Sequence, residues 1–403
     1  MRKANPEVLN KIKNAAKELL SEKTASEIGM RDIAAKCGIT AANIYHYYKN
    51  KDDLFKDISA SVSSVQEDNN SENNQKRKKM KELSKLMDFR PSIKVVDATL
   101  RDGGLVNDFY FPEGFEKAVY ETNVKAGIDY MEFGYRADKE MFDVNKFGPC
   151  KFSTDDFIRS IVGENDTDLK IAIMTDVGRT NYRQDLDEKA NSPVDLVRVA
   201  TYLHQMPGAI DMIENAKKKG YEVSCNIMAI SNSQESDLRV ALDLLGKSPV
   251  DMIYIVDSYG ALYPEQIERI VDLYSEFAEK YGKKLGIHAH DNQKLAFANT
   301  LEALGDGVDY LDATYASMGR GAGNCSMELL LATLRNPKYN LYYILKFLEE
   351  HMEPLKKSGV HWGYDIQYLL TGVLNQHPRT AIQFTKDERR DFSEFYKEIT
   401  TQA

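Results

Sequence analysis

From Ile93 onward, short apolar runs alternate with amphipathic stretches, and this alternation constrains the fold more than any other feature of the sequence. Eight runs have the length of a β-strand, and most are apolar without interruption, as is typical of parallel strands covered on both faces. They are residues 93–97, 129–135, 169–175, 195–202, 222–230, 252–258, 284–290 and 310–316. Eight β/α units in about 240 residues predict a closed (β/α)8 TIM barrel of the α/β class.

The stretches between the runs are typical of helices. Clear examples are PGAIDMIENAKKKG (207–220), SQESDLRVALDLLGK (233–247) and PEQIERIVDLYSEFAEKYG (264–282). Pro or Ser opens each of them and Gly ends several, as helix boundaries often do. An open doubly wound sheet is the alternative, but no GxGxxG motif follows the first run.

Composition changes before the barrel begins. Residues 1–92 hold 18 Lys and Arg against 13 Asp and Glu (net +5), whereas residues 93–403 hold 35 against 49 (net −14). The basic part permits a nucleic-acid surface that the acidic part argues against. We expect an all-α helix-turn-helix domain at 1–60, a polar linker at 61–92, the barrel at 93–338 and a helical C-terminal extension at 339–403.

The sequence contains neither a membrane-spanning run of eighteen apolar residues nor an N-terminal signal peptide. The four cysteines, Cys37, Cys150, Cys225 and Cys325, are widely spaced and form no CxxC motif. We interpret them as reduced thiols. These features predict a cytoplasmic protein with no membrane partner.

Three polar motifs follow barrel strands, where the reactive groups of such barrels lie. They are DATLRDGG (97–104), HAHDN with His288 and His290, and GRGAGN (319–324). Residues two apart on a strand point to one face, so both imidazoles should face inward, where Asp102 adds a carboxylate. Mixed N/O ligands suit Mn²⁺, our first choice, or Mg²⁺, Co²⁺ or Zn²⁺. The alternative is a histidine pair that only lines the barrel.

Arg101 adjoins Asp102 in what reads as a glycine-bounded loop. A buried arginine there would stabilise a developing enolate or bind a carboxylate with two hydrogen bonds, whereas a surface arginine on a turn is the alternative. We expect Gly103 and Gly104 to give this loop the freedom to bring both side chains over the barrel.

Taken in order, DATLRDGG, GIHAHDN and MGRGAGN resemble the motifs of the DRE-TIM metallolyases over roughly residues 93–335. This group includes HMG-CoA lyase, isopropylmalate synthase and 4-hydroxy-2-oxovalerate aldolase. The resemblance implies a divalent metal held by Asp102, His288 and His290. It also implies that Arg101 stabilises the enolate of a 2-oxo acid, and that Asn324 lies in the second sphere of the metal or binds substrate. Glu132 fits the acidic residue of the family, although a barrel-interior carboxylate paired with an arginine is an equal alternative.

Among these enzymes the aldolase is the most similar, because 310–332 and 256–267 resemble its eighth and sixth strand segments. The resemblance implies that Ser258 binds substrate. One departure concerns Leu105, where the aldolase has a histidine that shuttles a proton. By residue type, the candidates to transfer the proton in place of this histidine are Tyr135, Tyr259 and His361.

The C-terminal extension contains a polar and aromatic stretch, 361–381, with His361, His377 and Arg379. It would cap the barrel or contact substrate, or alternatively form a packed terminal helix.

Residues 30–55, MRDIAAKCGITAANIYHYYKNKDDLF, predict a helix at Met30–Cys37, a break at Gly38 and a second helix at Ala41–Lys49 capped by Thr40. The segment resembles the TetR-family helix-turn-helix over residues 5–58. That resemblance implies that Ile44 and Tyr48 point inward. The residues that remain available to contact the phosphates and base edges of duplex DNA include Thr40, Asn43, Tyr45, His46 and Lys51. A helical bundle that binds protein is the alternative.

Together these features predict a metal-dependent carbon–carbon lyase or aldolase for a 4-hydroxy-2-oxo acid, with an attached helix-turn-helix module. Two alternatives are open: a transcriptional regulator whose barrel senses a 2-oxo acid, and a Claisen-type acyl-transfer synthase. The intact set of Arg101, Asp102, His288 and His290 favours catalysis, and Leu105 favours the sensor. A lone module with few phosphate contacts binds DNA weakly, so we expect a homodimer or higher oligomer.

Overall fold

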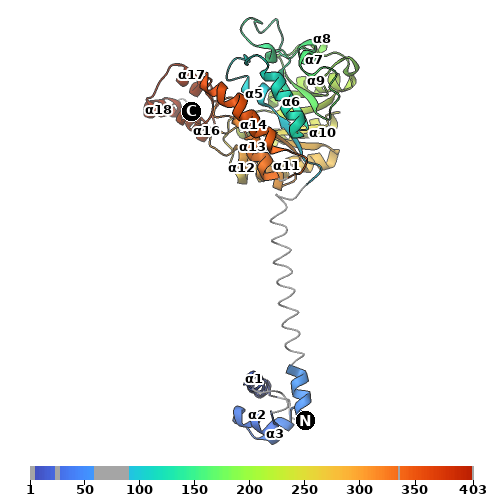
Figure 1. Ribbon diagram of the computed structural model, residues 1–403, viewed down its shortest axis with the longest axis vertical. Helices are drawn as coiled ribbons and strands as arrows, with labels where there is room; N and C mark the ends of the chain where they lie inside the picture. Colours follow the sequence, from blue (N-terminus) through green and yellow to red (C-terminus); the bar gives the residue numbers. More distant parts are fainter. Residues whose placement is uncertain (1–4, 23–27, 59–89, 335, 402–403) are drawn as a thin grey trace. The chain divides into compact units, whose positions relative to one another are not determined.

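The computed structural model describes residues 5–22, 28–58, 90–334 and 336–401. The chain forms two compact units, Met1–Ser84 and Lys85–Ala403, each of which is described by itself (Figure 1). The predicted linker at 61–92 lies almost wholly outside the described residues.

The larger unit contains a closed barrel of eight parallel strands in sequence order, which confirms the predicted TIM barrel. The pairing of β1 with β8, from Lys94 with Tyr310 to Asp97 with Ala313, closes the sheet and excludes the open doubly wound alternative. The strands are β1 (Lys94–Asp97), β2 (Tyr130–Tyr135), β3 (Lys170–Asp176), β4 (Leu196–Thr201), β5 (Glu222–Ile227), β6 (Met252–Asp257), β7 (Lys284–Ala289) and β8 (Tyr310–Ala313).

Two strands end three residues earlier than the sequence predicts. β5 stops at Ile227 rather than at residue 230, because Ala229 takes a left-handed conformation with φ 55° and a short turn follows. β8 stops at Ala313 rather than at residue 316, because 315–317 form a short turn in which Ala316 takes a left-handed conformation with φ 50°. In both cases apolar residues that read as strand belong instead to turns at the mouth of the barrel.

Helices surround the barrel and pack on the outward side chains of its strands. They are α6 (Phe115–Ala126), α7 (Asp155–Val162), α8 (Tyr182–Asp185), α9 (Met206–Lys218), α10 (Glu235–Lys247), α11 (Pro264–Tyr281), α12 (Ala296–Gly305) and α13 (Met327–Leu334). The inward side chains form a separate core of Val96, Tyr130, Ala172, Leu196, Met252, Tyr254 and Val256. Alternation along each strand therefore separates the core under the helices from the core inside the barrel.

The C-terminal extension is helical, as predicted, and packs in two groups. Helices α14 (Leu341–Phe347) and α15 (Glu353–Lys357), joined by a π-helical turn, add Phe347 and Leu355 to the main core. Helices α16 (Ile366–Val373), α17 (Arg379–Lys386) and α18 (Phe392–Thr401) share a smaller core that includes Ala322 of the glycine-rich loop. Figure 1 shows this second group gathered at one side of the barrel. The extension thus reaches the loop that follows β8.

The smaller unit is helical, with α1 (Pro6–Glu22), α2 (Met30–Cys37), α3 (Ala41–Tyr45) and a further helix at 51–58. Helix α2 ends at Gly38, which is left-handed with φ 69°, and this ending forms the predicted break. Thr40 takes the N-cap position of α3, but its side chain makes no capping hydrogen bond.

Helix α3 ends at Tyr45, four residues before the predicted end at Lys49. Tyr48 accounts for the difference, because it turns inward and its hydroxyl donates a hydrogen bond of 2.6 Å to Asp57 on the next helix. Ile44 is buried as well, so both predicted core positions of this segment are confirmed. Of the helices in the described ranges, none is both long and apolar enough to cross a membrane.

Candidate metal centre

Asp102, His288 and His290 come together at the C-terminal end of the barrel. Asp102 lies on α5 (Thr99–Gly103), directly after β1, while His288 lies in β7 and His290 just beyond its last residue. Their potential ligand atoms all lie within 4.8 Å of one another, and all three side chains are buried. Across the described ranges, this is the one cluster of three or more His, Cys, Asp or Glu residues arranged so that they can hold a metal ion.

Both imidazoles point to the same face, as the HxH spacing predicts. The Nε2 atoms of His288 and His290 lie 3.0 Å and 3.6 Å from Oδ2 of Asp102. The two rings are nearly perpendicular, with centroids 5.2 Å apart. A bridge between His290 and Asn324 holds the end of β7 against the glycine-rich loop. Two imidazole nitrogens and a carboxylate oxygen therefore converge on one point.

The segment after β1 is a helical turn rather than the open loop that the glycines predict. Gly104 has an ordinary helical φ of −58°, so it is not needed for a left-handed conformation. A Cβ atom there would collide with the ring of Phe109 and would lie 2.7 Å from the carbonyl oxygen of Leu100. Gly104 thus permits close packing, and the turn aims Arg101 and Asp102 inward from a fixed backbone.

Arg101 begins a chain of buried ion pairs inside the barrel. Its Nε atom lies 2.9 Å from Glu132, which also pairs with Arg198 at 2.8 Å. Arg198 in turn lies 2.6 Å from Asp312. Because each buried charge has an opposite partner, the cost of removing these groups from water is offset.

The chain of ion pairs closes into a ring through the metal-site residues. Asp312 Oδ2 lies 3.0 Å from His288 Nδ1, His288 Nε2 faces Asp102, and Asp102 lies 3.2 Å from Arg101. Each side chain in this ring therefore fixes the orientation of the next. The contact with Asp312 occupies Nδ1 of His288, so that Nε2 faces the site. In metal-binding histidines, a carboxylate is commonly bonded to the ring nitrogen that does not face the metal.

Sequence reasoning missed Arg198 and Asp312. Each interrupts an otherwise apolar strand run, and a charged residue at an inward position is a usable signal. The same arrangement bears on Glu132, which is fully buried and bonded to two arginines. It favours the ion-pair alternative for Glu132, whose carboxylate orients Arg101 and does not line the cavity described below.

The electrostatics of Asp102 and His290 suit a cation. Burial acts to raise the pKa of Asp102, but Arg101 and the two histidines outweigh it and hold that pKa well below its usual range. Burial, only partly offset by Asp102, holds the pKa of His290 well below its usual value. Asp102 is therefore ionised and His290 has a free lone pair, which are the forms that bind metals.

Asn324 completes the surroundings of the site. Its Nδ2 atom donates a hydrogen bond of 3.0 Å to Asp102 and lies 3.1 Å from Nε2 of His288. Its Oδ1 atom is buried and has no hydrogen-bond partner among the described residues. Asn324 therefore lies beside the predicted ligands and does not line the cavity described below. The donor set and its surroundings therefore fit a divalent ion held by Asp102, His288 and His290.

A cavity of about 400 Å³, its open mouth included, lies over these residues. Arg101, Ser258, Tyr135 and Leu105 line it, as does Arg320 of the glycine-rich loop. Ser258 accepts a hydrogen bond from the backbone of Ala229. The cavity therefore brings Arg101 and Ser258 together at the metal site, while Asn324 lies behind the carboxylate of Asp102.

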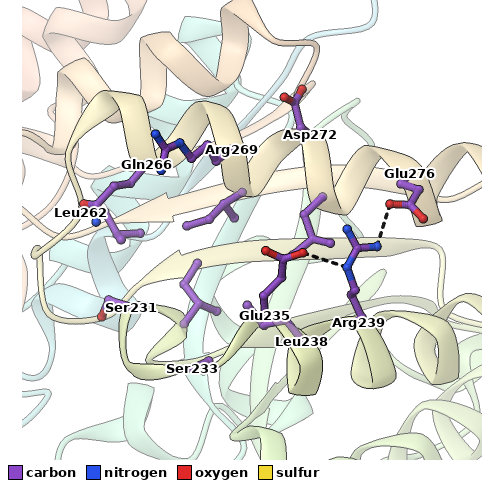
Figure 2. Close-up of a pocket in the computed structure, with 13 residues that line it drawn as sticks. Ser231, Ser233, Glu235, Leu238, Arg239, Leu262, Gln266, Arg269, Asp272 and Glu276 are labelled. Carbon is purple, nitrogen blue, oxygen red and sulfur yellow. Dashed lines mark hydrogen bonds and ion pairs between the residues drawn. The ribbon is translucent and has the colours of Figure 1, made fainter.

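A larger hollow of about 1210 Å³ lies between α10 and α11 on the outside of the barrel. Figure 2 shows that Arg239 extends between Glu235 and Glu276, with which it forms ion pairs of 2.9 Å and 2.8 Å. Because Arg239 is already paired with both glutamates and none of the three metal-site residues lines the hollow, we assign the chemistry to the smaller cavity.

Comparison with known proteins identifies the family. The model of the HMGL-like family matches residues 92–352, more than half of the chain. The chain belongs to the HMGL-like family. Residues 12–58 match the model of bacterial regulatory proteins of the tetR family. Both resemblances predicted from the sequence are thereby confirmed.

Relatives of the HMGL-like barrel include named aldolases. A 4-hydroxy-2-oxovalerate aldolase from Bacillus cereus is 28% identical over 309 residues, covering 74% of this chain and 88% of its own. One from Thermus thermophilus is 30% identical over 265 residues, covering 65% and 75%. Among solved structures, the N-terminal domain of a proposed aldolase from Bacteroides vulgatus is 27% identical, with a TM-score of 0.62, covering 73% of this chain and 96% of its own. The barrel is thus similar to lyases of this group.

The three candidates for the missing proton shuttle lie in different places. Leu105, the residue at the shuttle position, lines the cavity, and so does Tyr135. Tyr259 packs edge to face against His377, and exposed His361 pairs with Asp365. Tyr135 is therefore the one of the three whose side chain lines the cavity.

The C-terminal extension packs over the loops at the barrel mouth. Asn375 donates hydrogen bonds to Ser231 and Asn232, which follow β5. His377 lies against Tyr259, which follows β6. This part of the extension therefore covers the barrel mouth, which is one of the predicted alternatives. His361, in contrast, is exposed and does not line the cavity.

In the TetR-like unit, four of the predicted DNA-contacting residues, Thr40, Asn43, Tyr45 and His46, are exposed, while Lys51 is half-buried. The ring of Tyr45 is exposed and is therefore accessible to a partner. The four exposed residues lie on α3 or at its caps, where the second helix of a helix-turn-helix contacts DNA, whereas Lys51 lies on the following helix.

Proposed function

We propose that the barrel unit cleaves a 4-hydroxy-2-oxo acid into pyruvate and an aldehyde, with a divalent ion held by Asp102, His288 and His290. The observation that carries this proposal is the convergence of three ligand atoms within 4.8 Å, beside a buried arginine at the C-terminal end of the barrel. The named relatives support the same reaction class.

In this reaction the hydroxyl on C4 loses its proton, the C3–C4 bond breaks, and its electron pair forms an enolate that is protonated at C3. The bound ion supplies Lewis-acid polarisation of the 2-oxo group. Arg101 contributes Nη2, which is buried and has no hydrogen-bond partner among the described residues. An N–H group already oriented toward the developing oxyanion stabilises it without reorganisation. We assign proton exchange with the substrate to Tyr135, the phenol of the cavity wall.

A pyruvate-release assay tests this function directly. With Mn²⁺ and 4-hydroxy-2-oxopentanoate, the full chain is expected to release pyruvate and acetaldehyde, and His288→Ala to release neither. His361→Ala is the matched control, because this histidine is exposed and bonded to Asp365 away from the cavity. The proposal fails if the unaltered chain releases no pyruvate from 4-hydroxy-2-oxo acids, or if His288→Ala works as well as the control.

A regulator whose barrel senses a 2-oxo acid is the second candidate, and Leu105 is the observation that favours it. An alkyl side chain in the cavity wall transfers no proton, whereas binding requires no such transfer. The same assay separates the two candidates, since a sensor binds the 2-oxo acid without consuming it.

We further propose that the TetR-like unit binds duplex DNA through α3 and its neighbours. The support is the match of residues 12–58 to regulatory proteins and the exposed side chains of Asn43, Tyr45 and His46. Phosphate contacts dominate such binding and release counterions, so affinity should fall as salt increases, with a log–log slope of about −0.9 for each phosphate neutralised.

Four proteins test the DNA prediction. The full chain should shift duplex DNA at low salt, while residues 93–403 alone and Tyr45→Ala/Lys51→Ala should bind far more weakly. Lys17→Ala is a control, because Lys17 is an exposed cation on α1. Equal binding by the barrel alone, or no binding at low salt, would assign the unit to protein contacts instead.

A further inference from the structure

We propose that Arg320 binds a second carboxylate of the substrate, so that the cavity takes 2-oxo diacids in preference to 2-oxo monoacids. The inference rests on the proposed function of the same cavity and names its substrate class.

The loop after β8 holds Arg320 at the cavity. Gly321 and Gly323, with φ of 68° and 93°, give the loop turns that other residues rarely adopt. The Nη2 atom of Arg320 donates a hydrogen bond of 2.8 Å to the carbonyl oxygen of Ser258 and lies 3.5 Å from Nε2 of His290. The guanidinium therefore lies beside the metal site and is anchored at one nitrogen.

The remaining capacity of Arg320 is unused. No ion pair found in the described part of the chain includes this residue, and its Nε atom is buried without a hydrogen-bond partner there. Arg101 presents a second unused donor, Nη2, from the turn after β1. Buried donors without partners cost free energy unless a ligand satisfies them. The cavity wall thus offers two separate guanidinium groups to an anionic ligand.

The net charge of the cavity wall also favours a diacid over a monoacid. The charged residues that line it are Arg101, Arg320 and Asp102, which sum to +1. The buried ion pairs behind the wall, from Arg101 through Glu132 and Arg198 to Asp312, bring this sum to zero. A divalent ion then raises it to +2, so a 2-oxo monoacid leaves one positive charge uncompensated, whereas a diacid leaves none. Because a low-dielectric site strengthens such interactions, the second carboxylate should contribute to affinity.

The C-terminal cap adds positive potential near Arg320. Burial together with Arg320 and Arg379 lowers the pKa of His377 to about 4, so this ring is neutral at neutral pH and the positive charge beside it comes from the two arginines. Tyr259, which packs on His377, also lies within the field of both arginines. An acidic group extending from the metal site toward the cap would therefore meet cations.

One competing assignment is that Arg320 binds the carboxylate common to all 2-oxo acids. The two assignments differ in one measurable respect. If Arg320 binds the shared carboxylate, its removal weakens the binding of monoacids and diacids equally. If it binds a second carboxylate, its removal weakens diacids alone.

Calorimetry with two non-cleavable probes makes the comparison without relying on turnover. The probes are 2-oxoglutarate and 2-oxopentanoate, which have equal chain length and differ by a carboxylate in place of a methyl group. The full chain with Mn²⁺ should bind 2-oxoglutarate about 10- to 100-fold more tightly, as expected for a charge-assisted contact. Arg320→Gln should bring both affinities within about threefold of each other, and Arg320→Lys should restore part of the preference. Arg183→Gln, which removes an exposed arginine, should change neither affinity.

A cleavage pair separates failure of this inference from failure of the proposed function. The substrates 4-hydroxy-2-oxopentanedioate and 4-hydroxy-2-oxopentanoate give pyruvate plus glyoxylate and pyruvate plus acetaldehyde, respectively. Preference for the diacid probe without any cleavage supports the inference and overturns the aldolase. Cleavage of both substrates at equal kcat/KM, equal binding of the two probes by the unaltered chain, or equal weakening of both by Arg320→Gln would overturn the inference. The first and second of these need no variant to fold.

Discussion

Asp102→Asn and His290→Ala are each expected to yield a folded protein that no longer holds its divalent ion and has lost almost all activity. The ion contributes several kcal/mol of charge stabilisation, and each 1.36 kcal/mol corresponds to tenfold in rate. Turnover should therefore fall by about 10³-fold or more. Metal analysis of the purified proteins, with the unaltered chain beside them, is the direct measurement.

These two variants report on the site rather than on the fold for a structural reason. Asparagine keeps the shape of Asp102 and its place beside Asn324, and His290 lies outside the ring of buried ion pairs. Trp362 provides the check, because it is the only tryptophan of the chain and is buried against the barrel unit. Unchanged tryptophan fluorescence with full metal occupancy in both variants would rule the site out.

The positions of the ligands were predictable from the sequence because they depend on local rules. Continuous apolar runs mark parallel strands, strand ends mark the mouth of the barrel, and HxH spacing places two imidazoles on one face. Each rule uses only neighbouring residues. The structure accordingly places Asp102, His288 and His290 together with no revision of their positions.

The ring of ion pairs was not predictable in the same way. Glu132, Arg198 and Asp312 lie on β2, β4 and β8, and they meet because all three point inward across the barrel. Which inward positions face one another depends on how all eight strands are staggered, and no single run specifies that. Sequence reasoning therefore left the role of Glu132 open and passed over Arg198 altogether.

Other departures also depend on tertiary contacts. Gly104 is a glycine because the ring of Phe109 lies against it, which the turn itself does not require. Helix α3 ends early because Tyr48 bonds to Asp57 of the following helix. The position of the Arg320 guanidinium depends on a loop with two left-handed glycines, whose path does not follow from composition.

Arg101→Ala should keep the ion and lose about 10²- to 10³-fold in kcat, because it removes a donor aimed at charge that develops only in the transition state. The surrounding contacts allow the metal site to survive this change. Glu132 keeps its contact with Arg198, and Asp102 keeps those with His288 and Asn324. Steady-state kinetics with metal analysis of the same samples measures both expectations.

The division between kcat and KM decides what Arg101 does. Loss in kcat with KM nearly unchanged assigns Arg101 to the developing enolate, whereas a rise in KM alone assigns it to the ground-state carboxylate. Arg101→Lys is the informative companion, because it keeps the charge but loses the fork of N–H groups that reaches Glu132 and the cavity at once. Near-normal turnover of Arg101→Ala would show that Arg101 has only a structural role, as the partner of Glu132 in the barrel core. The metal ion alone would then have to stabilise the enolate.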